Sequence, residues 1–215
     1  DNFTGKKNRF LRAYYHAMES RLVHKVDLMV SVSHAAADYF AEEYHIHKPM
    51  VITNCALASE NVSEPVIKNE GFEVLNHGGF YAGRGYDLMV EAAPLLKEYP
   101  EIKLALRGFG GIENQLHKRA EELNAVNVVF YPKVKVEDLI PLAAGSMIGV
   151  AITEPICLNF KLSVSNKLFE YAAAGLPVIM SDIPEHRYLN EKYNFCLILP
   201  ESTPEALAEA IIKLY

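Results

Sequence analysis

The chain has 215 residues, of which 50% are hydrophobic, and it carries a formal net charge of -6. A chain of this length and composition can bury a full hydrophobic core, either as one large domain or as one domain with a fragment of a second. The acidic balance excludes a protein that binds a nucleic-acid backbone, because that function needs a basic face.

The cysteines and the longest apolar run indicate the compartment. Three scattered cysteines are too few for a disulfide framework or a zinc site, so a reducing cytoplasm is expected. The longest mostly apolar run, residues 139–152, is interrupted by Pro141 and Gly145. It falls short of the roughly 20 residues that a membrane-spanning helix needs. The chain begins at Asp1 without a basic and apolar signal pattern, which predicts a cytoplasmic segment cut from a longer protein.

Segments typical of strands and helices alternate along the whole chain. Short apolar runs bounded by polar or turn-forming residues predict strands near Asp27–Ser33, Met50–Thr53, Glu73–His77, Lys103–Arg107, Asn127–Phe130, Met147–Ile152, Val178–Ser181 and Cys196–Leu199. Helical patterns fall between these runs. The alternation predicts an α/β fold, with a doubly wound, Rossmann-like parallel sheet that helices cover on both faces.

The composition divides the chain into two bodies. Residues 1–54 hold a helix, a strand, a second helix that begins after Ser33 and another strand, which are too few elements to close a sheet. Residues 55–71 are polar and irregular and therefore predict a connector. Residues 72–215 hold the remaining strand and helix pairs, enough for a complete doubly wound domain.

Two helices of the second body carry clear start or break signals. Pro94 lies inside the helix that follows the first strand of this body and should kink it. The last helix begins at the run from Ser202 to Glu205, which combines capping residues, a proline and an acidic first turn.

The stretch of residues 163–181, SVSNKLFEYAAAGLPVIMS, is the most informative part of the chain. It predicts a helix that ends at Gly175, because glycine commonly follows the last helical turn. The chain then passes through Pro177 into a buried strand.

This helix carries a cation and a carboxylate close together. Asn166 and Glu170 share one face because they are four residues apart, and Lys167 lies on the flank of that face. The helix start near Val164 and the Lys167 amine can hold an anion, while Glu170 accepts hydrogen bonds from hydroxyls of the same ligand. These groups together predict a ligand that combines phosphate with sugar hydroxyls.

The loop after the first strand of the second body predicts a phosphate site. Ligands of doubly wound sheets bind outside the carboxyl ends of the strands, where the strand order reverses. This loop begins with Gly78 and Gly79 and contains Arg84. Glycine lets backbone amides approach a phosphate closely, and an arginine fork can bind two oxygens at once. A flexible turn is the alternative interpretation.

Two further loops follow predicted strands. Gly108 and Gly110 lie in a tight turn between a strand and a helix, so packing and ligand contact explain them equally well. Glu154 begins the loop that leads into the helix of residues 163–175. It would contact a sugar in one interpretation and only solvent in the other.

The run NKLFEYAAAGLPVI, residues 166–179, resembles the donor-nucleotide motif of retaining glycosyltransferases with the GT-B fold, of the family-four or glycosyltransferase group 1 type. The resemblance implies that Glu170 binds the ribose hydroxyls of the donor. It also implies that the residues just before Glu170 hold the diphosphate. Leu162 stands where the family often has a further glutamate.

The resemblance covers the glycine-rich loops as well. In the family the first loop carries an arginine and a lysine; here Gly79 replaces the arginine and Arg84 stands in the lysine position. The loop of Gly108 would lie beside the nucleotide. The loop with Lys133 and Val134 matches the position where the family reads the base with backbone groups.

Residues 1–54 resemble the closing segment of the family's acceptor-binding domain. There a helix with a glutamate, Glu19 here, precedes an apolar strand that begins with aspartate and ends with serine, Asp27–Ser33 here. Residues 72–215 would then be the nucleotide-sugar donor-binding domain. Most of the acceptor-binding domain is missing from this sequence, so the isolated chain should bind the donor and transfer little.

The resemblance implies a retaining transfer of a hexosyl group from a nucleoside diphosphate sugar to a glycan or lipid-linked acceptor, as in polysaccharide biosynthesis. Arg84 and Lys167 would have the catalytic role, because they would stabilise the negative charge that grows on the departing diphosphate. The aspartates include no Asp-x-Asp pair, so we expect no metal and no cofactor.

Two other functions share these features. A GT-B epimerase or phosphorylase would have the same fold and a nucleotide or phosphate crevice. A noncatalytic nucleotide-binding module for assembly would need no acceptor. The expected partners are a nucleotide sugar, the acceptor and the missing N-terminal domain, without nucleic acid. The expected location is the cytoplasm, with peripheral association at the inner face of a membrane left open.

Overall fold

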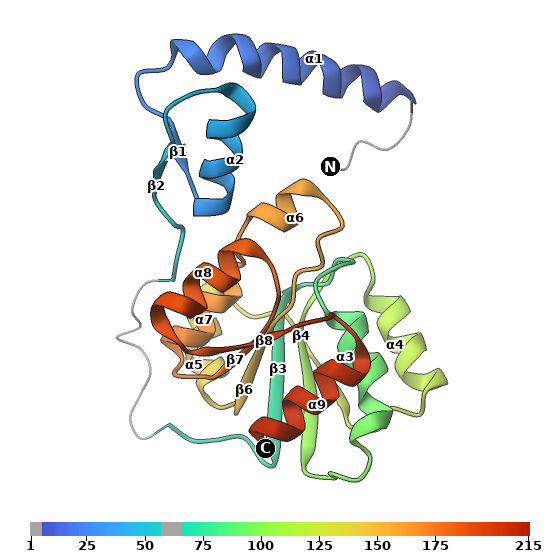
Figure 1. Ribbon diagram of the computed structural model, residues 1–215. Helices are drawn as coiled ribbons and strands as arrows, with labels where there is room; N and C mark the ends of the chain where they lie inside the picture. The colour runs from blue at the N-terminus through green and yellow to red at the C-terminus, as the bar shows by residue number, and fades with distance from the viewer. Residues whose placement is uncertain (1–5, 57–65) are drawn as a thin grey trace. The chain divides into compact units, whose positions relative to one another are not determined.

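The computed structural model describes residues 6–56 and 66–215 (Figure 1). Contacts between residues divide the chain into two units. The first consists of Asp1–Asn54 with Pro155–Val164, and the second of Cys55–Glu154 with Ser165–Tyr215. The grouping of Pro155–Val164 with the first unit is a feature that the sequence did not predict. The predicted connector, residues 55–71, lies partly outside the described residues.

Six parallel strands form the sheet of the second unit in the order β5-β4-β3-β6-β7-β8. The strands are β3 (Phe72–Gly79), β4 (Ile102–Phe109), β5 (Val128–Tyr131), β6 (Ile148–Ala151), β7 (Val178–Ser181) and β8 (Cys196–Leu199). The chain winds outward from β3 in one direction and from β6 in the other, so the strand order reverses between these two neighbours. The predicted doubly wound α/β sheet is confirmed.

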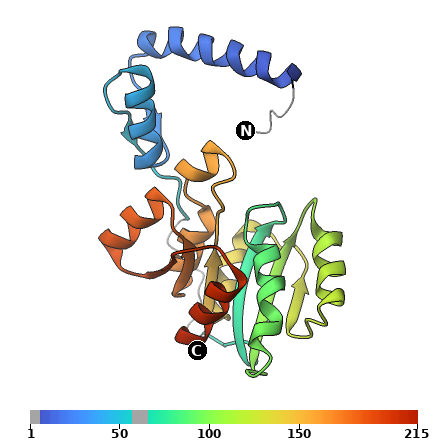
Figure 2. The same ribbon diagram turned by 45° about the vertical axis from the view of Figure 1, so that its right-hand side comes forward.

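Helices cover both faces of this sheet (Figures 1 and 2). They are α3 (Tyr86–Ala92), the 3-10 turn η2 (Ala93–Leu96), α4 (Glu113–Glu122), α5 (Val136–Ala144), α7 (Asn166–Ala173), α8 (Pro184–Tyr193) and α9 (Pro204–Leu214). On one face α3 packs against α4 and α9, and on the other α5 packs against α7. The carboxyl ends of β3 and β6 therefore lie between two helical layers.

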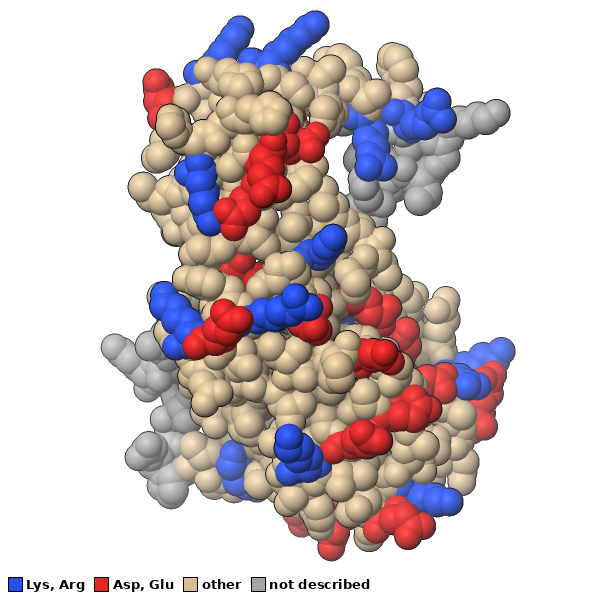
Figure 3. Space-filling model, in the orientation of Figure 1, with Lys and Arg blue, Asp and Glu red and all other residues tan. Residues whose placement is uncertain are grey.

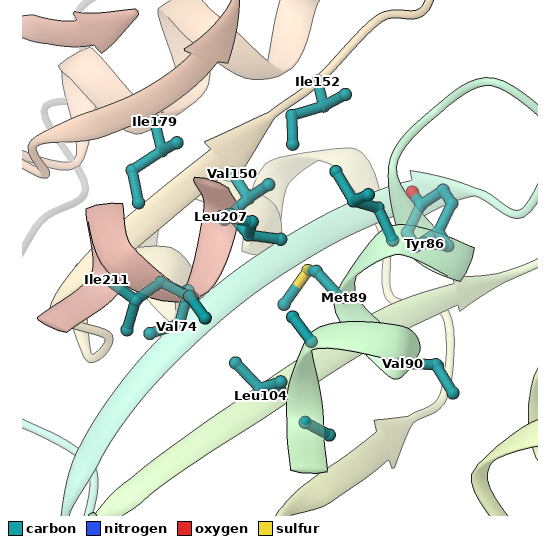
Figure 4. Close-up of a cluster of buried hydrophobic side chains, with 14 of the residues drawn as sticks. Val74, Tyr86, Met89, Val90, Leu104, Val150, Ile152, Ile179, Leu207 and Ile211 are labelled. Carbon is teal, nitrogen blue, oxygen red and sulfur yellow. The ribbon is translucent and has the colours of Figure 1, made fainter. Parts of the chain in front are cut away.

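The core of the second unit lies between the sheet and the layer of α3 and α9 (Figure 4). Val74 of β3, Leu104 of β4 and Met89 of α3 are fully buried there, as are Leu207 and Ile211 of α9. Burying one such side chain stabilises the folded state by roughly 1.5–3 kcal/mol.

The predicted helix signals are seen in the structure. Helix α3 ends at Ala92 and continues only as the turn η2, because Pro94 cannot donate the hydrogen bond of a regular helix. Helix α9 begins after Thr203, whose hydroxyl accepts a hydrogen bond from the Ala206 amide at 3.2 Å. Leu95, the residue after Pro94, is 44% exposed.

The first unit contains few elements in its described part. They are α1 (Lys6–Leu22), the 3-10 turn η1 (Val23–Lys25), β1 (Val30–Ser31), α2 (His34–Tyr44), β2 (Met50–Val51) and α6 (Leu158–Leu162). Strands β1 and β2 pair in parallel as a two-stranded sheet, shorter than the sequence predicted. Ser33 caps α2 by accepting a hydrogen bond from the Ala36 amide. The same hydroxyl donates to the carbonyl of Leu162 at 2.5 Å, which joins α6 to this unit.

The surface of the second unit carries both signs of charge on the face that Figure 3 displays, with acidic side chains interspersed among basic ones. That face has no continuous basic surface. Among the described residues, no helix is both long and apolar enough to pass through a bilayer.

Candidate functional site

Helix α7 and the end of strand β3 exchange two side-chain hydrogen bonds. The Lys167 Nζ donates to Oδ1 of Asn76 at 2.8 Å. The Nε2 atom of His77 lies 2.7 Å from Oε2 of Glu170. Two adjacent residues of β3 thus hold two residues that are one helical turn apart on α7. The cation and carboxylate that the sequence placed on this helix lie at the carboxyl edge of the sheet, beside the point where the strand order reverses.

Lys167 is a buried cation. Its side chain is 8% exposed, and its Nζ lies 4.8 Å from the centre of the Tyr86 ring. Burial, together with the positive charge of Arg84, lowers the pKa of Lys167 to about 7, although Glu170 acts in the opposite direction. An anion bound beside this amine would restore its proton, so the site is well suited to a ligand with negative charge.

Arg84 lies close enough to these groups to act on their charges. Its positive charge lowers the pKa of both Lys167 and Tyr86, although burial raises the pKa of Tyr86 more strongly. Its Nη1 lies 3.5 Å from Oγ1 of Thr153, two residues beyond the end of β6, and its carbonyl accepts a hydrogen bond from Asn76. The loop after β3 therefore places a second cation at the same edge of the sheet as Lys167.

Backbone conformation and close packing explain why glycine occurs in the first two loops. Gly78 and Gly108 adopt φ values of 122° and 148°, which other residues rarely adopt. A Cβ atom on Gly108 would lie 1.8 Å from the carbonyl oxygen of Gly78, and one on Gly110 would lie 2.4 Å from that of Phe80. Close packing of the two loops thus explains Gly108 and Gly110, and their contact with a ligand stays a prediction.

Gly79 has a different neighbour. A Cβ atom on Gly79 would lie 2.5 Å from the ring of Tyr81, which folds back over this residue and is 59% exposed. The ring fills the space where the side chain of an arginine would begin. A tyrosine ring therefore stands where the resemblance leads us to expect a diphosphate-binding cation, and Arg84 and Lys167 are the cations that remain.

The loop after β6 brings Glu154 near the loop after β3. The Glu154 amide donates to the carbonyl of Gly83 at 3.0 Å, so the two loops are hydrogen-bonded at the sheet edge. Burial raises the pKa of Glu154, and Asp87 raises it further. Its role toward a sugar stays a prediction.

The other predicted residues are more peripheral. Lys133 is exposed, with its Nζ 4.7 Å from the centre of the Phe109 ring, and Val134 is half-buried. Asn166 is exposed as the first residue of α7. Val164 is grouped with the first unit by its contacts. Its place beside the site residues of the second unit therefore stays a prediction. In the described part of the chain, no three His, Cys, Asp or Glu side chains are grouped as metal ligands would be.

A sequence profile described as "Glycosyl transferases group 1" matches residues 71–215. The chain belongs to this family. The match spans the whole sheet of the second unit, including both glycine loops and α7. A comparison with curated protein sequences found no match.

Solved GT-B glycosyltransferases share the fold. A variant of TarM from S. aureus, in complex with UDP, fondaparinux and alpha-GlcNAc-glycerol, is 16% identical with a TM-score of 0.74. Anabaena HepE in complex with UDP and glucose is 18% identical with a TM-score of 0.72. The pneumococcal O-GlcNAc transferase GtfA, with UDP and GlcNAc, is 17% identical with a TM-score of 0.66.

The alignments cover nearly all of this chain but less than three fifths of each relative. The covered shares of this chain are 100%, 98% and 93%, against 40%, 57% and 40% of TarM, HepE and GtfA respectively. At these identities the likeness shows a Rossmann-like α/β fold of the GT-B type. The chain thus spans only part of the length of these relatives.

Three residues at the candidate site were missed by the sequence analysis. Asn76 and His77, both buried, hold Lys167 and Glu170. The hydroxyl of Tyr86 is buried beside Gly78 and has no hydrogen-bond partner among the described residues. The signal that could have found the first two is the change from apolar to polar residues at the end of an otherwise apolar strand.

Proposed function

We propose that the second unit binds the donor of a retaining glycosyltransferase, which transfers a sugar from a nucleoside diphosphate sugar to a glycan or lipid-linked acceptor. The observation that carries the proposal is the meeting of Arg84, Lys167 and Glu170 at one edge of the sheet, where Asn76 binds both Lys167 and the Arg84 carbonyl and His77 binds Glu170. Two cations and one carboxylate match a ligand that has a diphosphate at one end and ribose hydroxyls next to it.

The cations act on the leaving group. When the bond between the sugar and the diphosphate breaks, negative charge grows on the diphosphate oxygens. Arg84 and Lys167 then stabilise the transition state more than the bound substrate, and this difference is what accelerates transfer. The buried position of Lys167 strengthens its effect, because little water screens its charge.

Glu170 binds the nucleoside part in this proposal. A carboxylate accepts hydrogen bonds and donates none at neutral pH, so hydroxyl groups are its natural partners. Its side chain is 18% exposed, which leaves part of the carboxylate accessible. The base itself is read by backbone groups near Lys133 and Val134, so the side chains there do not identify it.

The reaction proceeds without a metal in this proposal, because protein cations take the place of a metal ion beside the diphosphate. No cofactor takes part. The acceptor and the location at the cytoplasmic face of a membrane belong to the whole protein, of which this chain supplies the donor part. Alone, the chain binds the donor and transfers little.

The test is ligand-dependent melting with UDP, GDP and ADP. UDP is the first choice because the structures of TarM, HepE and GtfA contain it. A nucleotide at a hundred times its dissociation constant adds about 2.7 kcal/mol to the free energy of unfolding. We expect one of the three to raise Tm, also with EDTA present, and Lys167→Met to abolish most of the rise.

Lys213→Met is the matched control, since Lys213 is an exposed lysine of α9 in the same unit. It should leave the nucleotide-dependent rise unchanged. A Tm that none of the three nucleotides changes would contradict the donor-binding proposal and favour an assembly role. A rise that disappears with EDTA would contradict metal independence alone.

A further inference from the structure

We infer that His77 is a positioning residue for Glu170, whose imidazole fixes one carboxylate oxygen and directs the other toward the ribose of the donor. The inference rests on the proposed function, because it concerns the ribose contact of the donor site. It adds a residue from a different element, strand β3, to a contact that the family motif assigns to α7 alone.

The contact between His77 and Glu170 is short and involves only one of the two carboxylate oxygens. Nε2 of His77 and Oε2 of Glu170 are 2.7 Å apart. His77 is 1% exposed and Glu170 is 18% exposed, so the imidazole lies on the buried side of the carboxylate. Among the described residues, Oε1 of Glu170 has no hydrogen-bond donor. One oxygen is thus held by the protein and the other is available to a ligand.

The surroundings of the ring define its protonation. An ionised carboxylate only accepts, so Nε2 of His77 must carry the hydrogen of this bond. Nδ1 is buried and has no partner in the described part of the chain. A second hydrogen on Nδ1 would be an unsatisfied buried donor. Burial lowers the pKa of His77, and the positive charges of Lys167 and Arg107 lower it as well, although Glu170 acts in the opposite direction. The ring is therefore the neutral Nε2–H form.

The ring is also fixed in place from the side of α7. The His77 amide donates to the hydroxyl of Tyr171 at 2.9 Å, and the centres of the two rings are 4.6 Å apart. The Tyr171 ring in turn lies against Gly149 of β6, where a Cβ atom would come within 2.4 Å of it. Adjacent residues of α7 thus hold the backbone and the side chain of His77, so the imidazole cannot turn away from Glu170.

This arrangement determines what Glu170 can recognise. A glutamate on a helix surface can turn about three side-chain bonds, and fixing it in advance spares the binding step that loss of entropy. A fixed carboxylate with one open oxygen should discriminate between a ribose and a sugar that lacks both hydroxyls. Loss of the imidazole should reduce that discrimination, while the phosphate contacts of Arg84 and Lys167 remain.

The experiment compares UDP with 2′,3′-dideoxy-UDP by titration calorimetry on the full chain, its Glu170→Gln variant, and the variants His77→Leu and His77→Gln. Hydrogen bonds to a charged group predict that the wild type prefers UDP by about 10- to 100-fold. His77→Leu should lower this ratio to about 3-fold or less and leave the affinity for the dideoxy analogue unchanged. His77→Gln should restore much of the ratio, because its amide can donate from a similar position.

The outcomes separate the inference from the proposed function. A ratio that His77→Leu leaves unchanged, or equal weakening of both nucleotides, would mean a merely structural histidine and overturn the inference. Binding of UDP by the wild type without preference over the analogue would also overturn it, with phosphate binding intact. If the wild type binds neither UDP, GDP nor ADP, the proposed function fails and the inference with it.

A measurement on the unliganded wild type keeps the test independent of the variants. The nitrogen chemical shifts of the His77 ring should report a protonated Nε2 and a bare Nδ1 at pH 7, and Glu170→Gln should shift the Nε2 signal. A ring protonated at Nδ1 alone would overturn the inference even if His77→Leu failed to fold.

Discussion

The second unit buries its apolar side chains inside two helical layers, whereas the first leaves many of them at its surface. Val74 and Leu104 of the central strands are 0% exposed. In the first unit Val30, Val32, Met50 and Ile52, on or beside its two strands, are 45–59% exposed. A two-stranded sheet with one helix packed on it cannot cover both of its faces.

The difference teaches where the burial of the polar groups in the proposed donor site comes from. The site includes a lysine that is 8% exposed and a histidine that is 1% exposed. Polar groups remain so deeply buried only where closely packed neighbours exclude water and supply hydrogen bonds. The second unit supplies such packing here, and the hydrogen-bond partners of His77 and Lys167 all belong to it.

The largest effect should come from truncating a core side chain of the second unit. Leu104→Ala should lower the free energy of unfolding by about 2–5 kcal/mol, because it leaves a cavity between β4 and the helical layer. Urea unfolding followed by far-UV circular dichroism measures the change. Val32→Ala in the first unit should change it by less than about 0.5 kcal/mol, because this valine is already half in water. Equal losses in both variants would contradict the contrast between the units.

The next effect concerns the proton on Lys167. Its pKa of about 7 means that the free amine loses its proton as the pH rises through neutrality, so an anion that needs the charge must restore the proton on binding. Above pH 7 the affinity for UDP should therefore fall by up to about tenfold per pH unit. Calorimetry at pH 7, 8 and 9 in two buffers of different ionisation enthalpy measures both the affinity and the proton uptake.

The control compares a lysine from each unit. Lys167→Met should bind UDP weakly and without this pH dependence. Lys48→Met should behave as the wild type, because Lys48 of the first unit is 47% exposed and paired with Asp38. An affinity that is equal at pH 7 and pH 9, with no proton uptake, would show that Lys167 is not the group that binds the anion.

The smallest effects should come from the helix caps. Thr203→Ala removes the cap of α9 in the second unit and should cost about 1 kcal/mol, which raises amide exchange in α9 about fivefold. Ser33→Ala removes the cap of α2 and the bond to the Leu162 carbonyl, so its effect should be limited to the first unit. Hydrogen exchange by mass spectrometry locates both changes. Faster exchange of α9 in Ser33→Ala would mean that the two units unfold together.

Much of the second unit could be predicted from local signals. The strands β7 and β8 have the predicted bounds, because each is an apolar run enclosed by polar or turn-forming residues. Helix α7 stops before Gly175, whose φ of 74° suits glycine, and Pro94 ends α3 near the expected place. Strands β3 and β4 run further than predicted, since Gly78 and Gly108 continue the pairing despite their weak strand preference.

The hydrogen-bond partners in the site could not be predicted in this way. Lys167 binds Asn76 across 91 positions of sequence, and Glu170 binds His77 across 93. Periodicity and spacing act within a few residues, so they located Lys167 and Glu170 on one helix but not the strand residues that hold them. The need for glycine at position 108 also depends on a residue distant in sequence, because the atom that a Cβ would meet belongs to Gly78.

The chain crosses between its two units three times, after Asn54, after Glu154 and after Val164. This has a practical result for building chimeric enzymes. Exchanging only the residues before position 55 for those of another family member would leave α6 behind and take away the hydroxyl that binds the Leu162 carbonyl. A hybrid that keeps the proposed donor site intact must therefore import two stretches of sequence together, with the second junction directly ahead of α7.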